Sequence, residues 1–190
     1  GSNLLFSVGH KALWKPEVLY LASILAGLAV VEVIGRYTNR PVCIKWPNDI
    51  YVDNCKLAGI LCELQGSPQD EALLVIGIGV NVLHNPTGTD IPSIKVSDLV
   101  EKEPDRNALL ADLVSELIAQ IERANQYGVD DLQQRWQGFD YLYGKRVTVS
   151  QGPTNYHGIA QGIDMSGQLI VKIENAELKI FNGGEVSVRW

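Results

Sequence analysis

The sequence predicts an α+β fold, in which a mixed sheet packs with helices and a small all-β unit follows. Three observations support this fold class. A long apolar helical stretch comes after the first strand-like run, closely spaced strand-like runs fill residues 42–82, and glycine-rich turns separate short strands after residue 143. Short turns between neighbouring strands favour an antiparallel or mixed sheet over a series of βαβ units. A chain of 190 residues has room for one domain and a small appendage.

The first predicted elements are a strand and a buried helix. Residues 4–8 are strand-like, and Pro16 opens a helix that runs to about residue 37, at a position where the missing N–H of proline costs nothing. Residues 18–31 are almost wholly apolar, whereas a membrane span needs about 18 or more such residues. A helix that is apolar on every side over this length is expected to lie in the core.

The strands of the sheet follow this helix. Strand-like runs occupy residues 42–45, 50–52, 59–64 and 73–82. Asp53 and Asn54 are expected to form a turn after the second run, and residues 66–68, Gly-Ser-Pro, to form the next one. Residues 84–92 are rich in Asn, Pro, Gly and Thr, so we expect a loop there.

A second long helix has a clear start and a clear apolar face. Asp105 is a favourable N-cap, and the apolar residues after it recur at helical spacing. The predicted face consists of Leu109, Leu110, Leu113, Val114, Leu117, Ile118 and Ile121. The helix is expected to end near Gly128, and a short helix is expected over residues 130–137.

The pattern becomes all-β after residue 143. Short strand signals occur at residues 147–149, 158–162, 168–173 and 178–181. Such closely spaced strands with glycine turns predict a small barrel or sandwich of roughly 45 residues. The last stretch, residues 183–189 (Gly-Gly-Glu-Val-Ser-Val-Arg), is by itself typical of a turn and a closing strand.

Composition and charge exclude several classes of protein. Hydrophobic residues make up 46% and charged residues 20%, which excludes a disordered chain. The net charge of −6 argues against a general nucleic-acid binder, because phosphate contacts need a basic face, but it leaves room for a basic site for one nucleotide. The three cysteines, Cys43, Cys55 and Cys62, form neither a Cys-x-x-Cys nor a Cys-His pattern, and we expect reduced thiols in a cytoplasmic protein.

The first chemically informative stretch is residues 45–50, Lys-Trp-Pro-Asn-Asp-Ile. It packs a cation, an aromatic ring, an amide and a carboxylate into the end of a strand. Proline restricts the backbone, so these side chains are presented in a set geometry. From its chemistry alone the stretch is either a binding element or simply a polar turn.

Two further stretches place glycine at or inside a strand. In residues 56–61, Lys-Leu-Ala-Gly-Ile-Leu, the glycine would let a ligand or another backbone approach closely, and the alternative is an exposed hairpin lysine before a strand. In residues 77–82, Gly-Ile-Gly-Val-Asn-Val, two glycines interrupt an apolar strand. These two glycines serve either close packing against the long helix or a flat ligand that lies over the strand.

Together, these three stretches and the closing residues 183–189 resemble, in order and spacing, the biotin protein ligases, also called biotin–[acetyl-CoA carboxylase] ligases. The resemblance covers the whole chain. It implies a class II synthetase-like catalytic domain, of which residues 1–140 would be the C-terminal part, and an SH3-like β barrel at residues 143–190. Lipoate ligases are a weaker alternative, because residues 45–49 and 183–187 argue against them.

The resemblance also implies the reaction and its participants. Family members activate biotin with ATP to give biotinyl-5′-AMP, and then transfer biotin to one lysine of a biotin carboxyl carrier protein or domain of acetyl-CoA carboxylase. The expected small molecules are therefore ATP with Mg²⁺, and biotin as substrate. We expect a cytoplasmic protein that is able to form a homodimer, with neither a membrane nor a nucleic acid as partner of this chain.

Three catalytic residues follow from the resemblance. Lys56 resembles the family lysine between the biotin carboxylate and the α-phosphate, where a cation offsets the repulsion between two anions. Lys45 resembles a second cation on the same surface. Asp49 is the candidate to hold Mg²⁺ or to orient the incoming lysine amine.

Binding residues are implied in the same way. Lys56, Gly59, Leu61 and Gly77 resemble biotin-binding positions, and Gly79 would leave room for the ligand. The ATP-binding candidates are Asn48, Asp49, Asn81 and Arg189. Glu185 and Arg189 also resemble a pair that ties the β domain to the catalytic domain, although a surface ion pair of little energetic value is the alternative.

One part of the family pattern has no counterpart in this sequence. The family carries a Ser-Thr-Asn-type element and an Arg/Gly-rich loop, Gly-Arg-Gly-x-x-Gly-Arg followed by Trp, which line the biotin pocket. We therefore expect a truncated ligase with impaired activity. The alternative is a non-catalytic binding fragment that retains the nucleotide-side, carrier-docking and dimer surfaces.

This difference makes a prediction about biotin affinity. A polypeptide that adds the Arg/Gly-rich loop upstream of residue 1 should bind biotin at least roughly ten-fold more tightly than the present chain, a gain of about 1.4 kcal/mol. Isothermal titration calorimetry on the two polypeptides measures the ratio. Equal affinities would contradict the expectation.

Overall fold

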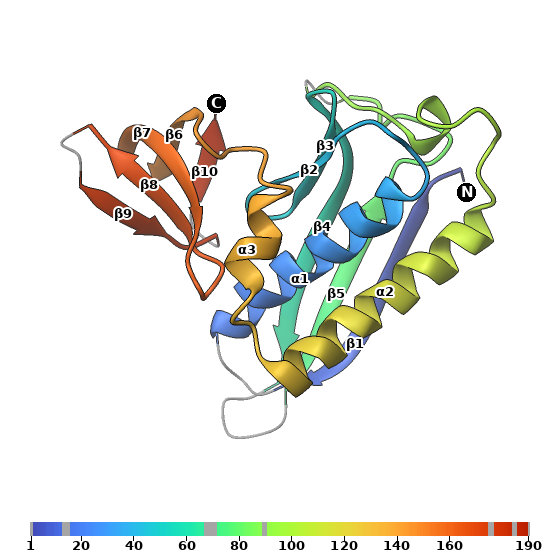
Figure 1. The fold of residues 1–190 in the computed structure, drawn as a ribbon, viewed down its shortest axis with the longest axis horizontal. Coiled ribbons are helices and arrows are strands. Elements are labelled where there is room, and N and C mark those ends of the chain that lie inside the picture. The colour runs from blue at the N-terminus through green and yellow to red at the C-terminus, as the bar shows by residue number, and fades with distance from the viewer. Residues whose placement is uncertain are drawn as a thin grey trace.

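The computed structural model describes residues 2–12, 16–66, 72–88, 91–174, 177–183 and 186–189. Within them the chain forms two five-stranded sheets with the strand orders β1-β5-β4-β3-β2 and β10-β6-β7-β8-β9. The second sheet lies beside the β2 side of the first (Figure 1). The predicted α+β class is confirmed.

The first sheet is antiparallel in every described strand pair, so it is not mixed. Its strands are β1 (Leu4–Ala12), β2 (Val42–Lys45), β3 (Asp49–Val52), β4 (Cys55–Gln65) and β5 (Ala72–Val80). Neighbours from β2 to β5 follow one another along the chain and reverse direction at each step, while β1 joins the far edge beside β5. Asp53 and Asn54 form the predicted turn, with φ of 50° and 63°. Of the predicted turn at 66–68, Ser67 and Pro68 lie outside the described residues.

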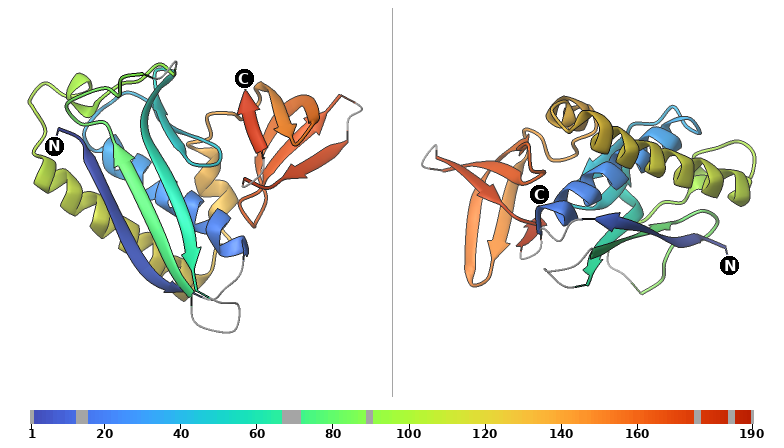
Figure 2. Two further views of the ribbon diagram at one scale, coloured as in Figure 1. Left: turned by 180° about the vertical axis from the view of Figure 1, so that it is seen from behind. Right: turned by 90° about the horizontal axis from the view of Figure 1, so that it is seen from below.

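Helices cover one face of this sheet and leave the other face open (Figure 2). The core helix α1 (Pro16–Gly35) contacts β2 to β5, and α2 (Arg106–Tyr127) packs against α1. Residues 22–34 of α1 are buried, apart from the half-buried Glu32. Because α1 is enclosed by the sheet and by α2, it is apolar on every side, as predicted. None of the described helices is long and apolar enough to cross a membrane.

The second long helix, α2, begins where the sequence predicted. Fewer residues of its predicted apolar face are buried than expected. The Asp105 carboxylate accepts hydrogen bonds from the amides of Asn107 (2.8 Å) and Ala108 (3.3 Å). Leu109, Leu113, Leu117 and Ile121 are buried, whereas Ile118 is 43% exposed, so its assignment to the buried face was wrong. The contact stripe on α2 follows residues four apart, and Ile118 lies about 100° away from it. The short helix α3 (Leu132–Gln137) and the 3₁₀ turn η1 (Val96–Asp98) complete the helical elements that the structure describes.

The second sheet contains the five short strands after residue 143, which are β6 (Arg146–Gln151), β7 (Thr154–Ile163), β8 (Leu169–Ile173), β9 (Leu178–Phe181) and β10 (Val186–Arg189). One side of this sheet is apolar and buried, with Val149, Ala160 and Val171 at its centre. The described residues contain no pairing of β9 with β10, so closure into an SH3-like barrel stays a prediction. The connection from α3 runs along the edge of β2, where the Ile44 amide donates to the Phe139 carbonyl at 2.7 Å.

The close pairing of β7 with β8 makes a prediction about stability. A Cβ atom at Gly158 would lie 2.4 Å from the Lys172 carbonyl oxygen, a backbone atom that cannot move alone. Gly158→Ala should therefore lower the free energy of unfolding by roughly 1–3 kcal/mol. Gly35→Ala is the matched control, because a Cβ atom there meets nothing within 4 Å. Thermal unfolding followed by circular dichroism measures both variants, and equal melting temperatures would contradict the prediction.

Candidate functional site

Strand alternation divides β4 and β5 into a helix-facing side and an open side. Ala58, Ile60, Ile76 and Ile78 are buried on the side that faces α1. The residues between them point the other way, because successive side chains on a strand alternate. Gly59, Gly77 and Gly79 fall on this open side, where Gly59 pairs with Gly79 and Leu61 pairs with Gly77.

The three glycines form a floor without side chains. A Cβ atom at Gly79 would lie 3.1 Å from Leu5 Cδ2, and one at Gly77 would lie 3.6 Å from Ser7 Oγ. Neither glycine faces α1, so the alternative in which they serve close packing against the long helix is wrong. At these three positions the open face of the sheet has no side chains, which leaves space above it.

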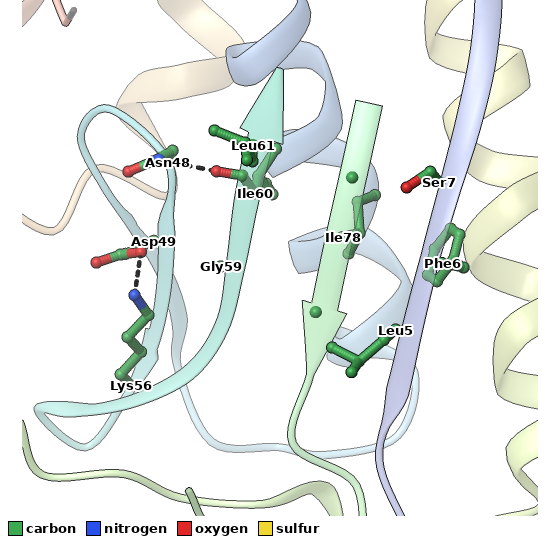
Figure 3. Close-up of a pocket in the computed structure, with 12 residues that line it drawn as sticks. Leu5, Phe6, Ser7, Asn48, Asp49, Lys56, Gly59, Ile60, Leu61 and Ile78 are labelled. Atoms are coloured by element: carbon green, nitrogen blue, oxygen red, sulfur yellow. Dashed lines mark hydrogen bonds and ion pairs between the residues drawn. The ribbon is translucent and has the colours of Figure 1, made fainter. Parts of the chain in front are cut away.

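A cavity of about 670 Å³ occupies this space (Figure 3). Its described lining consists of Leu5, Phe6, Ser7, Asn48, Asp49, Lys56, Gly59, Ile60, Leu61, Gly77, Ile78 and Gly79. Leu5 and Leu61 are 84% and 63% exposed, so two large apolar side chains stand open at its edges. The volume lies within the range of about 300–1,000 Å³ that is typical of small-molecule sites.

One end of the cavity is polar and carries the ion pair between Lys56 and Asp49. Lys56 Nζ lies 2.5 Å from Asp49 Oδ1, directly above Gly59, where a Cβ atom would come within 3.4 Å of the ammonium nitrogen. Asn48 Nδ2 donates to the Ile60 carbonyl at 2.8 Å, and the Ile60 amide donates to the Asn48 carbonyl at 2.9 Å. These bonds hold the turn that carries Asn48 and Asp49 against β4. The arrangement suits a ligand with an apolar body and an anionic end.

Lys45 lies beside this polar end and is not among the described lining residues. It pairs with Asp49 in the register of β2 and β3, and its Nζ lies 5.9 Å from the centre of the Tyr51 ring. Burial lowers the pKa of Lys45, the Asp49 carboxylate opposes that shift, and the neighbouring Lys56 adds to it. Lys45, Asp49 and Lys56 therefore influence one another electrostatically, whereas a catalytic role of Lys45 stays a prediction.

A smaller cavity of about 230 Å³ adjoins the first one through Lys56, Gly59 and Gly79. Asn81, Pro86, Ile91 and Ser93 are among its other lining residues. Asn81 Nδ2 donates to the carbonyls of Lys56 (3.3 Å) and Ile94 (3.2 Å). Asn81 thus braces the loop against the start of β4 and at the same time lines the smaller cavity.

Sequence reasoning missed the residues that β1 contributes. Leu5 pairs with Gly79 and Ser7 pairs with Gly77, so β1 forms one wall of the cavity. The sequence did indicate a strand at residues 4–8. However, Leu5, Phe6 and Ser7 are two apolar residues and a serine, a combination that does not indicate a binding site. Their position follows from a strand pairing that joins residues about 70 positions apart, which local patterns do not reveal.

Of the two C-terminal candidates, the structure describes only Arg189, which is not among the described lining residues of this cavity. Arg189 lines a separate cavity of about 780 Å³ on the second sheet, together with Arg146, His157 and Lys172. That cavity shares no described lining residue with the first two. Glu185 lies outside the described residues, so its predicted pairing with Arg189 stays a prediction.

The described residues do not fit a metal centre held by the chain alone. They contain no group of three or more His, Cys, Asp or Glu side chains that could hold a metal ion. Asp49 is the one acidic residue of the described cavity lining, and its carboxylate is already paired with Lys56. Mg²⁺ usually binds through one or two carboxylates together with substrate phosphates, so a metal here would depend on a phosphorylated ligand.

Comparison with known families identifies two regions of the chain. Residues 1–81 match the Biotin/lipoate A/B protein ligase family. Residues 142–189 match the Biotin protein ligase C terminal domain. The first region contains the glycine floor together with Asn48, Asp49 and Lys56, and the second contains the five strands of the second sheet.

Solved structures show the same fold. The biotin protein ligase from Aquifex aeolicus in complex with biotin and ATP superposes with a TM-score of 0.86 at 23% identity, over 99% of this chain and 78% of that one. A biotin protein ligase-like protein of unknown function from Silicibacter superposes with a TM-score of 0.79 at 12% identity, over 95% and 79% of the two chains.

Curated relatives match this chain over nearly its whole length, so each match includes both family regions. The bifunctional ligase/repressor BirA of Escherichia coli is 34% identical over 191 residues, and the match spans 100% of this chain but 59% of the length of BirA. The biotin–[acetyl-CoA-carboxylase] ligase of Mycobacterium tuberculosis is 31% identical over 196 residues, which span 99% of this chain and 70% of that protein. Identity at this level over the whole chain, together with the two family regions, shows that the chain belongs to the biotin protein ligase family.

Proposed function

We propose that this chain carries the site at which biotin is activated with ATP to biotinyl-5′-AMP and then transferred to a lysine of a carrier domain. The observation that carries the proposal is the glycine-floored cavity that ends at the Lys56–Asp49 ion pair. The names of the relatives and the biotin and ATP complex of the structural neighbour support the same reaction.

The cavity suits biotin in one orientation. The fused rings and the aliphatic chain would lie over Gly77 and Gly79, between the apolar side chains of Leu5 and Leu61. The carboxylate would then reach Lys56 above Gly59. Burial of the apolar body would supply affinity, and the Lys56 ammonium would select the anionic end.

The activation step joins two anions and therefore needs positive charge at the reacting centre. An oxygen of the biotin carboxylate attacks the α-phosphorus of ATP, the bond from this phosphorus to the bridging oxygen breaks, and pyrophosphate leaves. Lys56 would offset the repulsion between the carboxylate and the phosphate, and Lys45 would add a second cation from the neighbouring strand. In the transfer step the lysine amine attacks the acyl carbon, AMP leaves, and the nitrogen loses a proton.

The nucleotide would occupy the polar end and the smaller cavity. Asn48 and Asp49 line the polar end of the larger cavity, Lys56 lines both cavities, and Asn81 lines the smaller one. Mg²⁺ would arrive on the ATP phosphates, with Asp49 as a ligand or as the group that orients the acceptor amine. The predicted contact of Arg189 with ATP has no support from its position in the separate cavity.

The wider assignments follow from the family. We propose a catalytic domain within residues 1–140 and a small β domain at residues 143–190, which agrees with the second family region. The acceptor is the biotin carboxyl carrier protein or domain of acetyl-CoA carboxylase, as the name of the Mycobacterium tuberculosis relative implies. A homodimer and a cytoplasmic location belong to the same proposal.

Lys56 gives the sharpest test of the chemistry. Lys56→Ala should lower the rate of biotin-dependent pyrophosphate release at least about 100-fold, because it removes the cation between the two reacting anions. Far-UV circular dichroism should show an unchanged fold, since Lys56 lies at the surface of the cavity. Lys102→Ala, which removes an exposed lysine before α2, is the control and should retain the normal rate. Near-normal release by Lys56→Ala would remove Lys56 from this role.

The glycine floor gives an independent test of biotin binding. A Cβ atom at Gly77 meets its neighbours at ordinary contact distances of 3.5 and 3.6 Å, so Gly77→Val should fold normally while its branched side chain fills the cavity. We expect biotin affinity to fall at least about ten-fold in titration calorimetry. Gly9→Val is the matched control, because Gly9 is exposed on the same sheet and does not line the cavity. Unchanged affinity of Gly77→Val would place biotin elsewhere.

The chain tested by itself distinguishes a ligase from a binding fragment. Pyrophosphate release that depends on both biotin and ATP would show that the chain performs the activation step. Binding of ATP or of the carrier domain without any release would favour the non-catalytic alternative. The extended polypeptide that carries the upstream loop is the positive control for both measurements.

A further inference from the structure

The second sheet contacts the strand end that carries the polar part of the cavity. Trp46, the first residue after β2, is 1% exposed, and its indole Nε1 donates a buried hydrogen bond of 2.9 Å to the carbonyl of Gly167. Gly167 belongs to the turn between β7 and β8, 121 residues further along the chain. A buried tryptophan N–H without a partner would be costly, so this bond holds the two sheets in one relative position.

The turn that accepts this bond is itself rigid. The Asp164 carboxylate accepts hydrogen bonds from the amides of Ser166 (2.8 Å) and Gln168 (2.9 Å). Gly167 has a φ of 79°, which other residues rarely adopt. A Cβ atom on Gly167 would also lie 3.0 Å from Ile24 Cγ1, so the turn fits closely between Trp46 and α1.

The next residue, Pro47, is held from two sides. Ser23 Oγ on α1 donates to the Pro47 carbonyl at 3.2 Å. On the other side a Cβ atom at Gly183, in the connection between β9 and β10, would lie 3.1 Å from Pro47 Cβ. Two turns of the second sheet and one helix of the first therefore enclose residues 46 and 47.

The residues that follow are the polar residues of the cavity. Asn48 and Asp49 come directly after Pro47, and Asp49 makes the 2.5 Å ion pair with Lys56. One residue, Asn48, separates Pro47 from Asp49, so a shift of the Trp46–Pro47 segment would reach Asp49 through Asn48. Gly77 and Gly79 make no direct pairing with this segment, because their positions follow from the pairing of β5 with β1 and β4, whereas Gly59 also pairs with Asp49.

We infer that Trp46 and Gly167 are positioning residues, through which the second sheet sets the placement of the Asp49–Lys56 pair for the activation step without affecting the biotin floor. The inference rests on the proposed function. It predicts that loosening this contact changes the rate of chemistry and leaves biotin binding unchanged. A displacement of about 1 Å of a reacting group can reduce a rate about 100-fold, so a small movement is sufficient.

Two variants test the inference in the protein. Gly167→Ala inserts a methyl group against Ile24 and strains a positive φ, and Trp46→Phe removes the indole donor while keeping an aromatic ring. Gly152→Ala is the matched control. Gly152 has a φ of 56° in another turn of the same sheet and meets nothing within 4 Å, so it carries similar backbone strain without the contact.

We expect both test variants to lower kcat for biotin-dependent pyrophosphate release at least about ten-fold, with the biotin dissociation constant within about two-fold of the unmodified protein. Gly152→Ala should retain a nearly normal kcat. All assays are run below the melting temperature of each variant. Should Gly167→Ala fail to fold, Trp46→Phe alone decides the outcome.

Three results would overturn the inference. The first is a kcat of the test variants close to that of Gly152→Ala. The second is a parallel loss of biotin affinity and kcat, because a purely structural role would weaken both. The third is an unmodified protein that binds biotin but releases no pyrophosphate, and this result, unlike the first two, removes the proposed function as well.

Discussion

The packing of α1 against one face of the first sheet determines where the site can be. Because α1 packs on this face, every second residue of β4 and β5 points toward the helix and is buried. Ile60, Ile76 and Ile78 are among these residues. The residues between them must face outward, and two of these are Gly77 and Gly79. The same alternation that builds the core therefore leaves a floor without side chains on the opposite face.

Charge is arranged locally within an acidic chain. The net charge of −6 does not favour binding of a polyanion, but the candidate site places Lys56 and Lys45 beside one carboxylate, Asp49. A paired lysine costs less to hold near an apolar cavity than an isolated one. When an anionic ligand enters, the carboxylate and the ligand share the positive charge, so a small number of cations can serve a strongly charged reaction.

The two sheets are joined by direct contacts as well as by the chain. The hydrogen bond from Trp46 to Gly167 reaches the segment that ends in Asp49. A small β unit with its own apolar side can in this way influence a site to which it contributes no described lining residue. The close contact depends on the absence of a side chain at position 167, because a Cβ atom there would lie 3.0 Å from Ile24 Cγ1.

The sequence by itself determined the α+β class, the core helix, the Asp105 cap and the stretches that contain Asp49, Lys56 and the glycines, because turn, cap and alternation patterns are local. Only the tertiary structure decided that the sheet is wholly antiparallel, that the wall from β1 faces the floor, and that Arg189 lies in a separate cavity. These features depend on which distant segments pair to bury apolar surface, and no local pattern records that choice.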